Sequence, residues 1–270
     1  MVRSTALSAI TAAWALLSFG CAPPEAPAEQ RRDSVPAALI AHAGGGLPHE
    51  GQLLDYTNSR EALDHAYEQG HRLFELDFQW TTDRQLVALH DWDKTFRKLF
   101  HGEPRPLSRA EFLELESNFG LQQMDLTAVL EWLSEHPDSR IVTDIKGNNL
   151  AGLALIREIA ADKQDRFIPQ IYGALQWNPA LELGYTDIIF TLYRSDISDS
   201  QLFEFVAKQI PFAITMPTSR ARSSLPGELK ERGVFSYAHT INSAAEYAEL
   251  RERWGVDGVY TDEIAPDESF

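Results

Sequence analysis

The sequence predicts one α/β domain, a single (β/α)8 barrel of the TIM type with an irregular second β/α unit. Three observations support this prediction. The chain has 270 residues, of which 44% are hydrophobic and 24% charged, as is typical of soluble globular domains. Between residues 35 and 270, short apolar β-branched runs alternate with amphipathic stretches, without a low-complexity linker or tandem repeat. These roughly 235 residues suit such a barrel, which typically needs about 250.

The strands and helices expected in this barrel follow from that alternation. The expected strands span residues 38–42, 73–78, 86–90, 140–145, 167–171, 187–192, 212–215, 235–240 and 258–261. The expected helices include residues 60–69, 125–135, 150–162, 199–208 and 244–254. For the first helix we expect a capping box from Asn58 to Glu61, with Gly70 just beyond the helix end.

The second β/α unit has too little chain for a crossover helix. Too few residues lie between Asp77 and Leu86, because such connections need a dozen or more. An extended return of about nine residues covers roughly 30 Å, enough to run down the length of a strand and start again. With nine strand candidates for eight places, we expect one candidate to lie outside the barrel.

The N-terminal segment predicts export and a lipid anchor. Residues 1–20 are typical of a signal peptide, because Arg3 precedes an uncharged run that is too short to span a bilayer as a helix. The residues Leu17-Ser18-Phe19-Gly20-Cys21 are similar to a bacterial lipobox, and Cys21 is the only cysteine. We therefore expect lipidation of Cys21, a flexible tether over residues 21–34 and the barrel domain over residues 35–270. The alternative is ordinary signal cleavage near this point.

These features predict an extracytoplasmic protein of the cell envelope. With the anchor it would be a membrane-bound bacterial lipoprotein, and without it a periplasmic or secreted protein. The chain has 40 acidic and 24 basic residues and a formal net charge of −16, so we expect no nucleic-acid partner. One cysteine excludes an intrachain disulfide and a cysteine-based zinc site. Nothing in the sequence indicates an obligate protein partner.

Acidic residues alternate with apolar ones in two of the expected strands. Glu75 and Asp77 project to one face of the first, and Asp144 and Lys146 share a face of the second. Both faces of a parallel strand in this fold are buried, so neighbouring carboxylates need a compensating cation. A divalent metal with oxygen ligands, Mg²⁺ or Ca²⁺, is one hypothesis. A set of buried salt bridges with Lys146 is the other.

Two histidines end expected strands. His42 precedes a glycine-rich run, and His90 precedes Asp91. Catalytic groups of barrel enzymes collect at the carboxyl ends of the strands, so both histidines are expected at the same rim. A single histidine at a strand end is usually a structural hydrogen-bonding residue, but a pair beside a carboxylate cluster favours catalysis.

Several motifs follow one another in a distinctive order. They are His42 with its glycines, Asn58 before a helix, Glu75-Leu76-Asp77, Thr82-Asp83, His90-Asp91, Asp144-Ile145-Lys146, Thr240-Ile241-Asn242 and the segment from Gly255 to Asp262. In order and spacing, these motifs resemble the glycerophosphodiester phosphodiesterase family from about Ile40 to Asp262. The resemblance implies a barrel related to phosphatidylinositol-specific phospholipase C.

The resemblance also implies roles for individual residues. It implies a divalent metal held by Glu75, Asp77 and Asp144, with His42 and His90 as the acid/base pair. Phosphate or substrate contacts would come from four further residues, namely Lys146, Asn58, Asn242 and His239.

The chain departs from the family pattern at three positions. The family usually has an arginine after the first histidine, where this chain has Ala43, so Lys146 or Arg194 would have to contact the phosphate. The third metal ligand is commonly a glutamate but is Asp144 here, as in the related sphingomyelinase D branch. The aromatic residue before the Thr-x-Asn motif is usually tryptophan, and here it is His239.

The sequence therefore predicts a metal-dependent phosphodiesterase that hydrolyses glycerophosphodiesters or related phospholipid head-group diesters. The expected substrate is a small-molecule or lipid phosphodiester. Two alternatives stay open. One is a phospholipase C- or D-like enzyme that forms a cyclic phosphate, and the other is a surface lipoprotein that binds a phosphorylated ligand without turnover.

Overall fold

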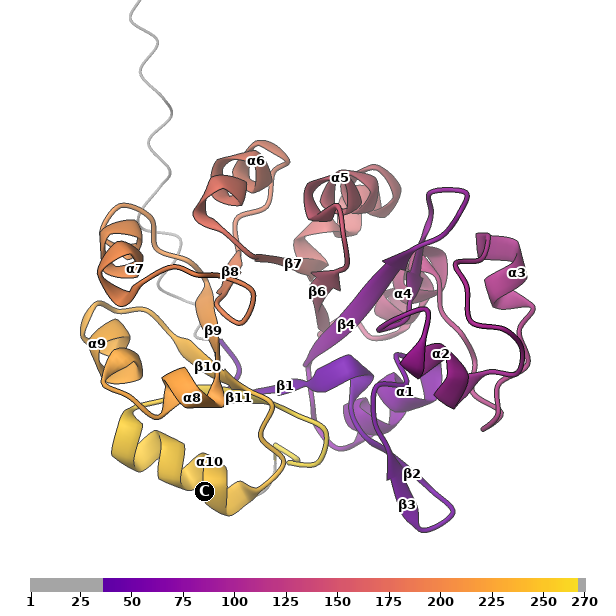
Figure 1. Cartoon of the computed structure of the whole chain (residues 1–270), viewed down its shortest axis with the longest axis horizontal. Coiled ribbons are helices and arrows are strands. Elements are labelled where there is room, and N and C mark those ends of the chain that lie inside the picture. Colours follow the sequence, from indigo (N-terminus) through magenta and orange to yellow (C-terminus); the bar gives the residue numbers. More distant parts are fainter. Residues whose placement is uncertain (1–35, 267–270) are drawn as a thin grey trace, which may run out of the picture. The chain divides into compact units, whose positions relative to one another are not determined.

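The computed structural model describes residues 36–266, so the predicted signal peptide, Cys21 anchor and tether lie outside the described residues. Within that range, eight parallel strands close into a TIM-type barrel, which confirms the predicted fold class (Figure 1). A pairing of Ala41 with Phe74 joins the first strand to the fourth and closes the barrel. In order around the barrel the strands are β1 (Leu39–Ala41), β11 (Gly258–Thr261), β10 (Ser236–His239), β9 (Ala213–Pro217), β8 (Ile189–Thr191), β7 (Phe167–Ile171), β6 (Arg140–Ile145) and β4 (Leu73–Trp80).

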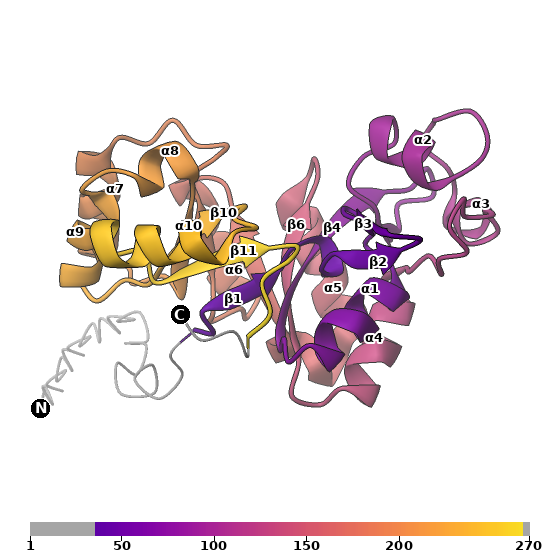
Figure 2. The ribbon, with the colours of Figure 1, turned by 90° about the horizontal axis from the view of Figure 1, so that it is seen from below.

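Helices connect these strands and surround them. They are α1 (Arg60–Glu68), α4 (Leu126–Glu135), α5 (Asn149–Ala160), α6 (Trp177–Glu182), α7 (Asp199–Val206), α8 (Thr218–Ala221), α9 (Leu225–Glu231) and α10 (Ala244–Glu249). Shorter helical turns are η1 (His42–Gly44), η2 (Ala161–Arg166), η3 (Ala174–Gln176) and η4 (Leu250–Trp254). Figure 2 shows α7, α9 and α10 on one side of the strands and α1 and α4 on the other. All five expected helices are confirmed, whereas α6, α8 and α9 were not predicted.

The second unit is irregular, as predicted, but its return does not run the length of a strand. A turn closed by the Thr81 amide, which donates to the Gln85 carbonyl over 2.9 Å, leads directly into β5 (Leu86–Ala88). This strand pairs antiparallel with the end of β4, with Phe78 opposite Ala88, and it lies outside the barrel. The prediction of a ninth strand outside the barrel is therefore confirmed, and the expected restart of the chain at the bottom is wrong because a short turn favours a hairpin.

Two insertions extend the rim at the carboxyl ends of the strands. After η1 the chain forms a hairpin of β2 (Leu47–His49) and β3 (Gln52–Leu54). After β5 it forms α2 (Lys94–Leu99) and α3 (Arg109–Leu113), which share a small core of their own. That core consists of Val87, Leu89, Phe96, Leu99, Phe100, Leu107 and Phe112.

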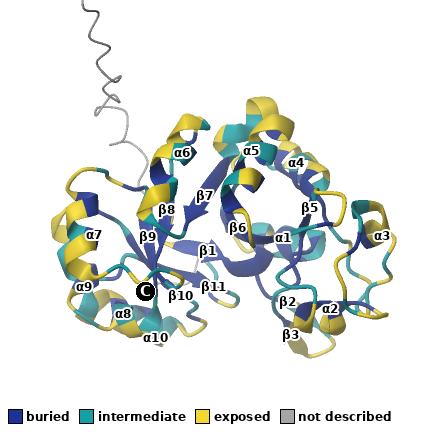
Figure 3. Ribbon diagram, turned by 45° about the horizontal axis from the view of Figure 1, so that its top comes forward, coloured by how far each residue is buried: buried dark blue, intermediate teal, exposed yellow. Residues whose placement is uncertain are grey.

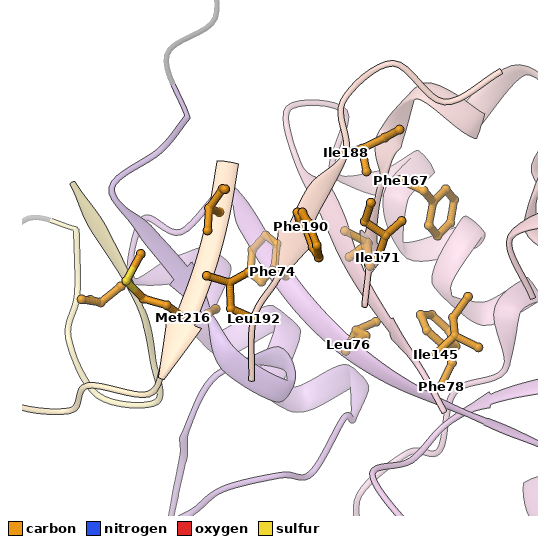
Figure 4. Close-up of a cluster of buried hydrophobic side chains, with 14 of the residues drawn as sticks. Phe74, Leu76, Phe78, Ile145, Phe167, Ile171, Ile188, Phe190, Leu192 and Met216 are labelled. Carbon is orange, nitrogen blue, oxygen red and sulfur yellow. The ribbon is translucent and has the colours of Figure 1, made fainter. Parts of the chain in front are cut away.

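The main core lies between the strands and the surrounding helices. Strand residues that face outward, such as Phe74, Leu76 and Phe78 of β4, pack against neighbouring strands and helices (Figure 4). The barrel strands are buried over most of their length, while the helices present exposed residues on their outer faces (Figure 3). Among the described helices, none combines the length and apolar character that a membrane crossing requires.

The inward-facing residues form two layers that lie two positions apart on each strand. The lower layer is an apolar cluster with one residue from each barrel strand: Ile40, Leu73, Val142, Ile168, Ile189, Ala213, Tyr237 and Tyr260. Two positions further along, on the same face, the residues are polar. This upper layer consists of His42, Glu75, Asp144, Gln170, Thr191, Thr215, His239 and Asp262. The carboxylate and imidazole side chains inside the barrel therefore lie at the carboxyl end of the strands.

Candidate active site

Three carboxylates converge at the carboxyl end of the barrel. Glu75 and Asp77 lie on β4, and the strand register places Asp77 directly opposite Asp144 of β6. All three side chains are buried, and one oxygen atom of each lies within 4.8 Å of the others. The structure thus brings together the three acids that the sequence predicted to share a site.

Lys146 compensates part of this negative charge. Its Nζ lies 2.5 Å from Oδ1 of Asp77 and 2.8 Å from Oδ2 of Asp144. Burial alone would raise the pKa of Asp144, but Lys146 and Arg194 lower it to about 2. Burial and the neighbouring Asp77 carboxylate instead raise the pKa of Glu75. The predicted salt bridges are present, yet within residues 36–266 Glu75 has no ion pair of its own.

The donor set fits the hard cation that the sequence predicts. Mg²⁺ and Ca²⁺ bind oxygen ligands, and three buried carboxylates supply such ligands within a small volume. Burial first, and the Asp77 carboxylate next, raise the pKa of Glu75 and disfavour its charged form, which a nearby divalent cation would stabilise. Glu75, Asp77 and Asp144 would hold the ion, with Lys146 beside it.

Asp144 has further partners that the sequence analysis did not assign to it. The hydroxyl of Tyr172 donates to its Oδ1, and the hydroxyl of Tyr193 donates to its Oδ2 over 2.6 Å. One terminal nitrogen of Arg194 lies 3.6 Å from Oδ1. Tyr172 follows β7 directly and Tyr193 follows β8. Their positions just after expected strands were the only signal in the sequence that these tyrosines belong to the site.

His42 lies in the centre of the site and is held by Asp262. Its Nδ1 is 2.8 Å from Oδ1 of Asp262. Burial would lower the pKa of His42, but the hydrogen bond to Asp262 and the charges of Glu75, Asp262 and Asp77 raise it to about 9. Asn242 in turn donates from Nδ2 to Oδ2 of Asp262 over 2.8 Å and accepts the Asp262 amide proton. Asn242 thus holds the Asp262 carboxylate in position by hydrogen bonds.

His90 reaches the same rim by a different route from the expected one. It follows the antiparallel strand β5, which returns along β4, so the amide of Leu89 donates to the Asp77 carbonyl over 3.0 Å. His90 is therefore at the level of the carboxylates. Its side chain is half-buried, and its Nδ1 lies 2.9 Å from Oδ2 of Asp91. His90 therefore lies at the rim, although it follows β5 and not a strand of the barrel.

Asn58 and Ala43 fix the orientation of the two acids on β4. Nδ2 of Asn58 donates to Oδ2 of Asp77 over 3.1 Å, and Oδ1 of Asn58 accepts from the Asp77 amide. The predicted capping box is wrong, because the Asn58 side chain hydrogen-bonds Asp77. Ser59 caps α1 instead, and its hydroxyl accepts a hydrogen bond from the Ala62 amide. The amide of Ala43 donates to Oε2 of Glu75 over 2.8 Å.

Six phenol and imidazole rings form a row along one side of the site, in which each ring contacts the next. His239 stacks on Tyr193 with 5.4 Å between the ring centroids and meets His42 edge-on at 4.8 Å. Burial and the charge of His42 lower the pKa of His239 to about 3, so its imidazole is neutral. We call this row the aromatic arc, and its members in order are Tyr172, Tyr193, His239, His42, Tyr56 and His90.

Comparisons with known proteins agree with the barrel fold. The model of the "Glycerophosphoryl diester phosphodiesterase family" matches residues 45–170. A glycerophosphodiester phosphodiesterase from Thermotoga maritima shares 23% identity, with a TM-score of 0.65 over 84% of this chain and 95% of that one. One from Agrobacterium tumefaciens shares 18%, with a TM-score of 0.61 over 84% and 96% of the two chains.

A third similar structure contains a reaction product. It is an Oleispira antarctica phosphodiesterase in complex with sn-glycerol-3-phosphate, with 18% identity and a TM-score of 0.65 over 84% of this chain and 93% of that one. These likenesses extend over nearly all of each solved chain and agree with the barrel described above. Residues 45–170 therefore match the glycerophosphoryl diester phosphodiesterase family by sequence, as the motifs predicted, and the barrel that they help to form has the fold of the solved structures.

Proposed function

We propose that this protein is a metal-dependent phosphodiesterase that hydrolyses glycerophosphodiesters or related phospholipid head-group diesters. One observation carries the proposal. The buried cluster of Glu75, Asp77 and Asp144 lies at the carboxyl end of the barrel, with His42 and His90 in the same aromatic arc. The family match supports the reaction class, and the product complex of the Oleispira antarctica enzyme supports a glycerol phosphate product.

The residues of the site have separate roles in phosphate binding and proton transfer. Bound to the three carboxylates, a divalent cation supplies positive charge that offsets the shielding of phosphorus by its nonbridging oxygens. Lys146, which already pairs with two of the acids, contributes a fixed positive charge beside the phosphate. One of the two histidines takes the proton of the attacking oxygen, and the other donates a proton to the leaving alcohol. Asp262 keeps the His42 ring oriented for its step.

The test is an assay of the purified protein on a glycerophosphodiester such as glycerophosphoethanolamine. With Mg²⁺ or Ca²⁺ we expect release of glycerol phosphate and the free alcohol, loss of turnover in EDTA and recovery when the metal is returned. Phosphorus NMR identifies the product. A cyclic phosphate as the final product would favour the phospholipase C- or D-like alternative, which shares this site.

The second alternative is a lipoprotein that binds a phosphorylated ligand without turnover. Ala43 favours it, because this side chain cannot replace the phosphate-binding arginine of the family pattern. The intact pair of histidines and the acid cluster favour turnover. Binding of glycerol 3-phosphate with no hydrolysis of any glycerophosphodiester, with either metal, would decide for the binding protein.

We further propose that lipidation of Cys21 anchors the protein to a membrane in the cell envelope. The proposal rests on the signal-like segment that ends at the only cysteine. The variant Cys21→Ser should move from the membrane fraction to a soluble fraction and keep its turnover number. Unchanged fractionation of this variant would contradict the anchor.

A further inference from the structure

Tyr56 lies between the two histidines of the site. Its ring centroid is 4.6 Å from that of His42 and 4.8 Å from that of His90, and both contacts are edge-to-face, at 85° and 75°. Edge-to-face contacts favour a particular relative orientation of two rings. A single half-buried side chain therefore contacts both groups that the proposed function assigns to proton transfer.

The backbone holds Tyr56 in a conformation that bulky residues rarely adopt. Its φ is +56°, in the left-handed region. Both flanks are tied down, because Nζ of Lys98 donates to the Asp55 carbonyl over 2.9 Å and the Asn58 amide donates to the Ala43 carbonyl over 3.0 Å. Such strain persists only where the surroundings fix it, and it is concentrated at functional sites. The fold therefore fixes this ring in place.

The hydroxyl of Tyr56 has no hydrogen-bond partner among residues 36–266. The two other phenols of the aromatic arc, Tyr172 and Tyr193, both donate to Asp144. Burial, together with the charges of Asp262 and Asp77, raises the pKa of Tyr56 to about 12, so the hydroxyl remains a proton donor. Tyr56 thus brings an unused donor to a site that has to bind an anion.

We propose that Tyr56 is a substrate-contacting residue, with a hydroxyl that donates a hydrogen bond to a nonbridging oxygen of the bound phosphodiester and a ring that sets the orientation of His42 and His90. The proposal rests on the function proposed above and names a residue of that site. Ala43, which follows His42, offers no side-chain donor on this side of the site, so Tyr56 supplies a neutral one there.

Two variants separate the roles of the hydroxyl and the ring. Tyr56→Phe removes one oxygen and keeps the ring, and it should lower kcat/KM roughly 10- to 100-fold, as expected for a lost hydrogen bond to a charged group. It should weaken binding of inorganic phosphate, measured by calorimetry with Mg²⁺, by a similar factor, and it should leave the pH profile unchanged. Tyr56→Leu should also shift the pH profile of kcat/KM, because both imidazoles lose their ring contact.

The control is Tyr67→Phe, since Tyr67 lies on α1 and its hydroxyl donates to Asp138 away from the site. This variant should match the wild type in turnover and in phosphate binding. Melting temperatures of all variants show whether they fold. If Tyr56→Leu does not fold, Tyr56→Phe still tests the hydroxyl. An unchanged pH profile of Tyr56→Phe then shows that the hydroxyl is not needed to set the titration of the two histidines.

The outcomes distinguish this proposal from the proposed function. Turnover and phosphate affinity of Tyr56→Phe within twofold of the wild type would overturn the hydrogen bond to phosphate. Phosphate binding that depends on Tyr56, in a protein that hydrolyses no diester, would support the contact and overturn the hydrolase function. A wild-type protein that binds no phosphate and hydrolyses no diester would overturn both.

Discussion

The lower and upper layers of the barrel interior lie only two residues apart on the same eight strands, yet their chemistry is opposite. The lower layer holds aliphatic side chains and two tyrosines, all buried. Fully burying one aliphatic side chain contributes about 1.5 to 3 kcal/mol to folding. The upper layer holds carboxylates, imidazoles and hydroxyls, whose burial is unfavourable unless each group finds a partner.

This difference separates stability from function along the strands. On β7, Ile168 belongs to the lower layer and Gln170, two residues on, accepts a hydrogen bond from Thr191 in the upper layer. Barrel enzymes generally place catalytic groups at the carboxyl ends of their strands and stabilising contacts at the other end. Substitutions in the upper layer should therefore change turnover, and those in the lower layer should change the free energy of unfolding.

The largest expected effect is on the two histidines. His42→Ala and His90→Ala should each lower turnover roughly 10²- to 10⁴-fold, equivalent to about 3 to 5 kcal/mol of activation free energy. With p-nitrophenol as the leaving group, which hardly needs protonation, the variant that lacks the acid should recover and the other should not. Steady-state kinetics on both substrates checks this. Activity within a few-fold of wild type in either variant would contradict the paired mechanism.

The next effect concerns the acid cluster. Glu75→Gln should lower turnover about 10³-fold, equivalent to about 4 kcal/mol, because the cation loses a charged ligand. The raised pKa of Glu75 means that ionisation at rising pH destabilises the metal-free protein, so this variant should melt no lower than the metal-free wild type. Added Mg²⁺ or Ca²⁺ should raise the melting temperature of the wild type only.

A matched control for that variant lies on the surface. Asp93→Asn removes a carboxylate that pairs with Arg97 on α2, where both side chains are exposed. It should change neither turnover nor the metal-dependent shift in melting temperature, because exposed ion pairs contribute little. No metal-dependent shift in the melting temperature of the wild type at millimolar concentrations would favour a salt-bridge cluster over a metal site.

The lower layer should respond in the opposite sense. Ile168→Ala should reduce the free energy of unfolding by about 3 kcal/mol, since it leaves a cavity in a fully buried cluster. Urea denaturation measures this loss, and kinetics on the folded variant should give the wild-type turnover number. A fall in turnover that accompanies full folding would show that the two layers are not separate in function.

The smallest effect is on a buried histidine outside both layers. Burial lowers the pKa of His71 from 6.5 to about 4, and its Nε2 pairs with the Ile264 carbonyl over 3.1 Å. The folded state thus binds fewer protons than the unfolded state between these values. Relative to neutral pH, where His71 is neutral in both states, the folded state loses stability progressively as the pH falls from 6.5 toward 4.

His71→Gln keeps a donor for the Ile264 carbonyl and removes the titration. Its free energy of unfolding should therefore change less between pH 6.5 and pH 4 than that of the wild type. Chemical denaturation at several pH values measures the difference. Parallel curves for the two proteins would show that His71 does not contribute to the pH dependence, and turnover at pH 7 should be the same in both.

The sequence by itself determined the fold class and the acids that form the buried cluster. Both depend on local periodicity, because alternation at every second residue places Glu75 and Asp77 on one face wherever the strand lies. The alternation of strand-like and helix-like segments likewise predicted the barrel and a ninth strand outside it. For the same reason the closeness of Asp144 followed once both strands were placed in one parallel sheet.

Only the tertiary structure decided which groups support and complete the site. Asn58 has a local capping pattern, yet its side chain hydrogen-bonds Asp77, which lies on a later strand. His90 reaches the rim because β5 pairs antiparallel with β4, and Tyr56 meets both histidines because its loop is tied down at both ends. These contacts join residues far apart in the chain, and no local pattern encodes them, since they depend on how the barrel closes.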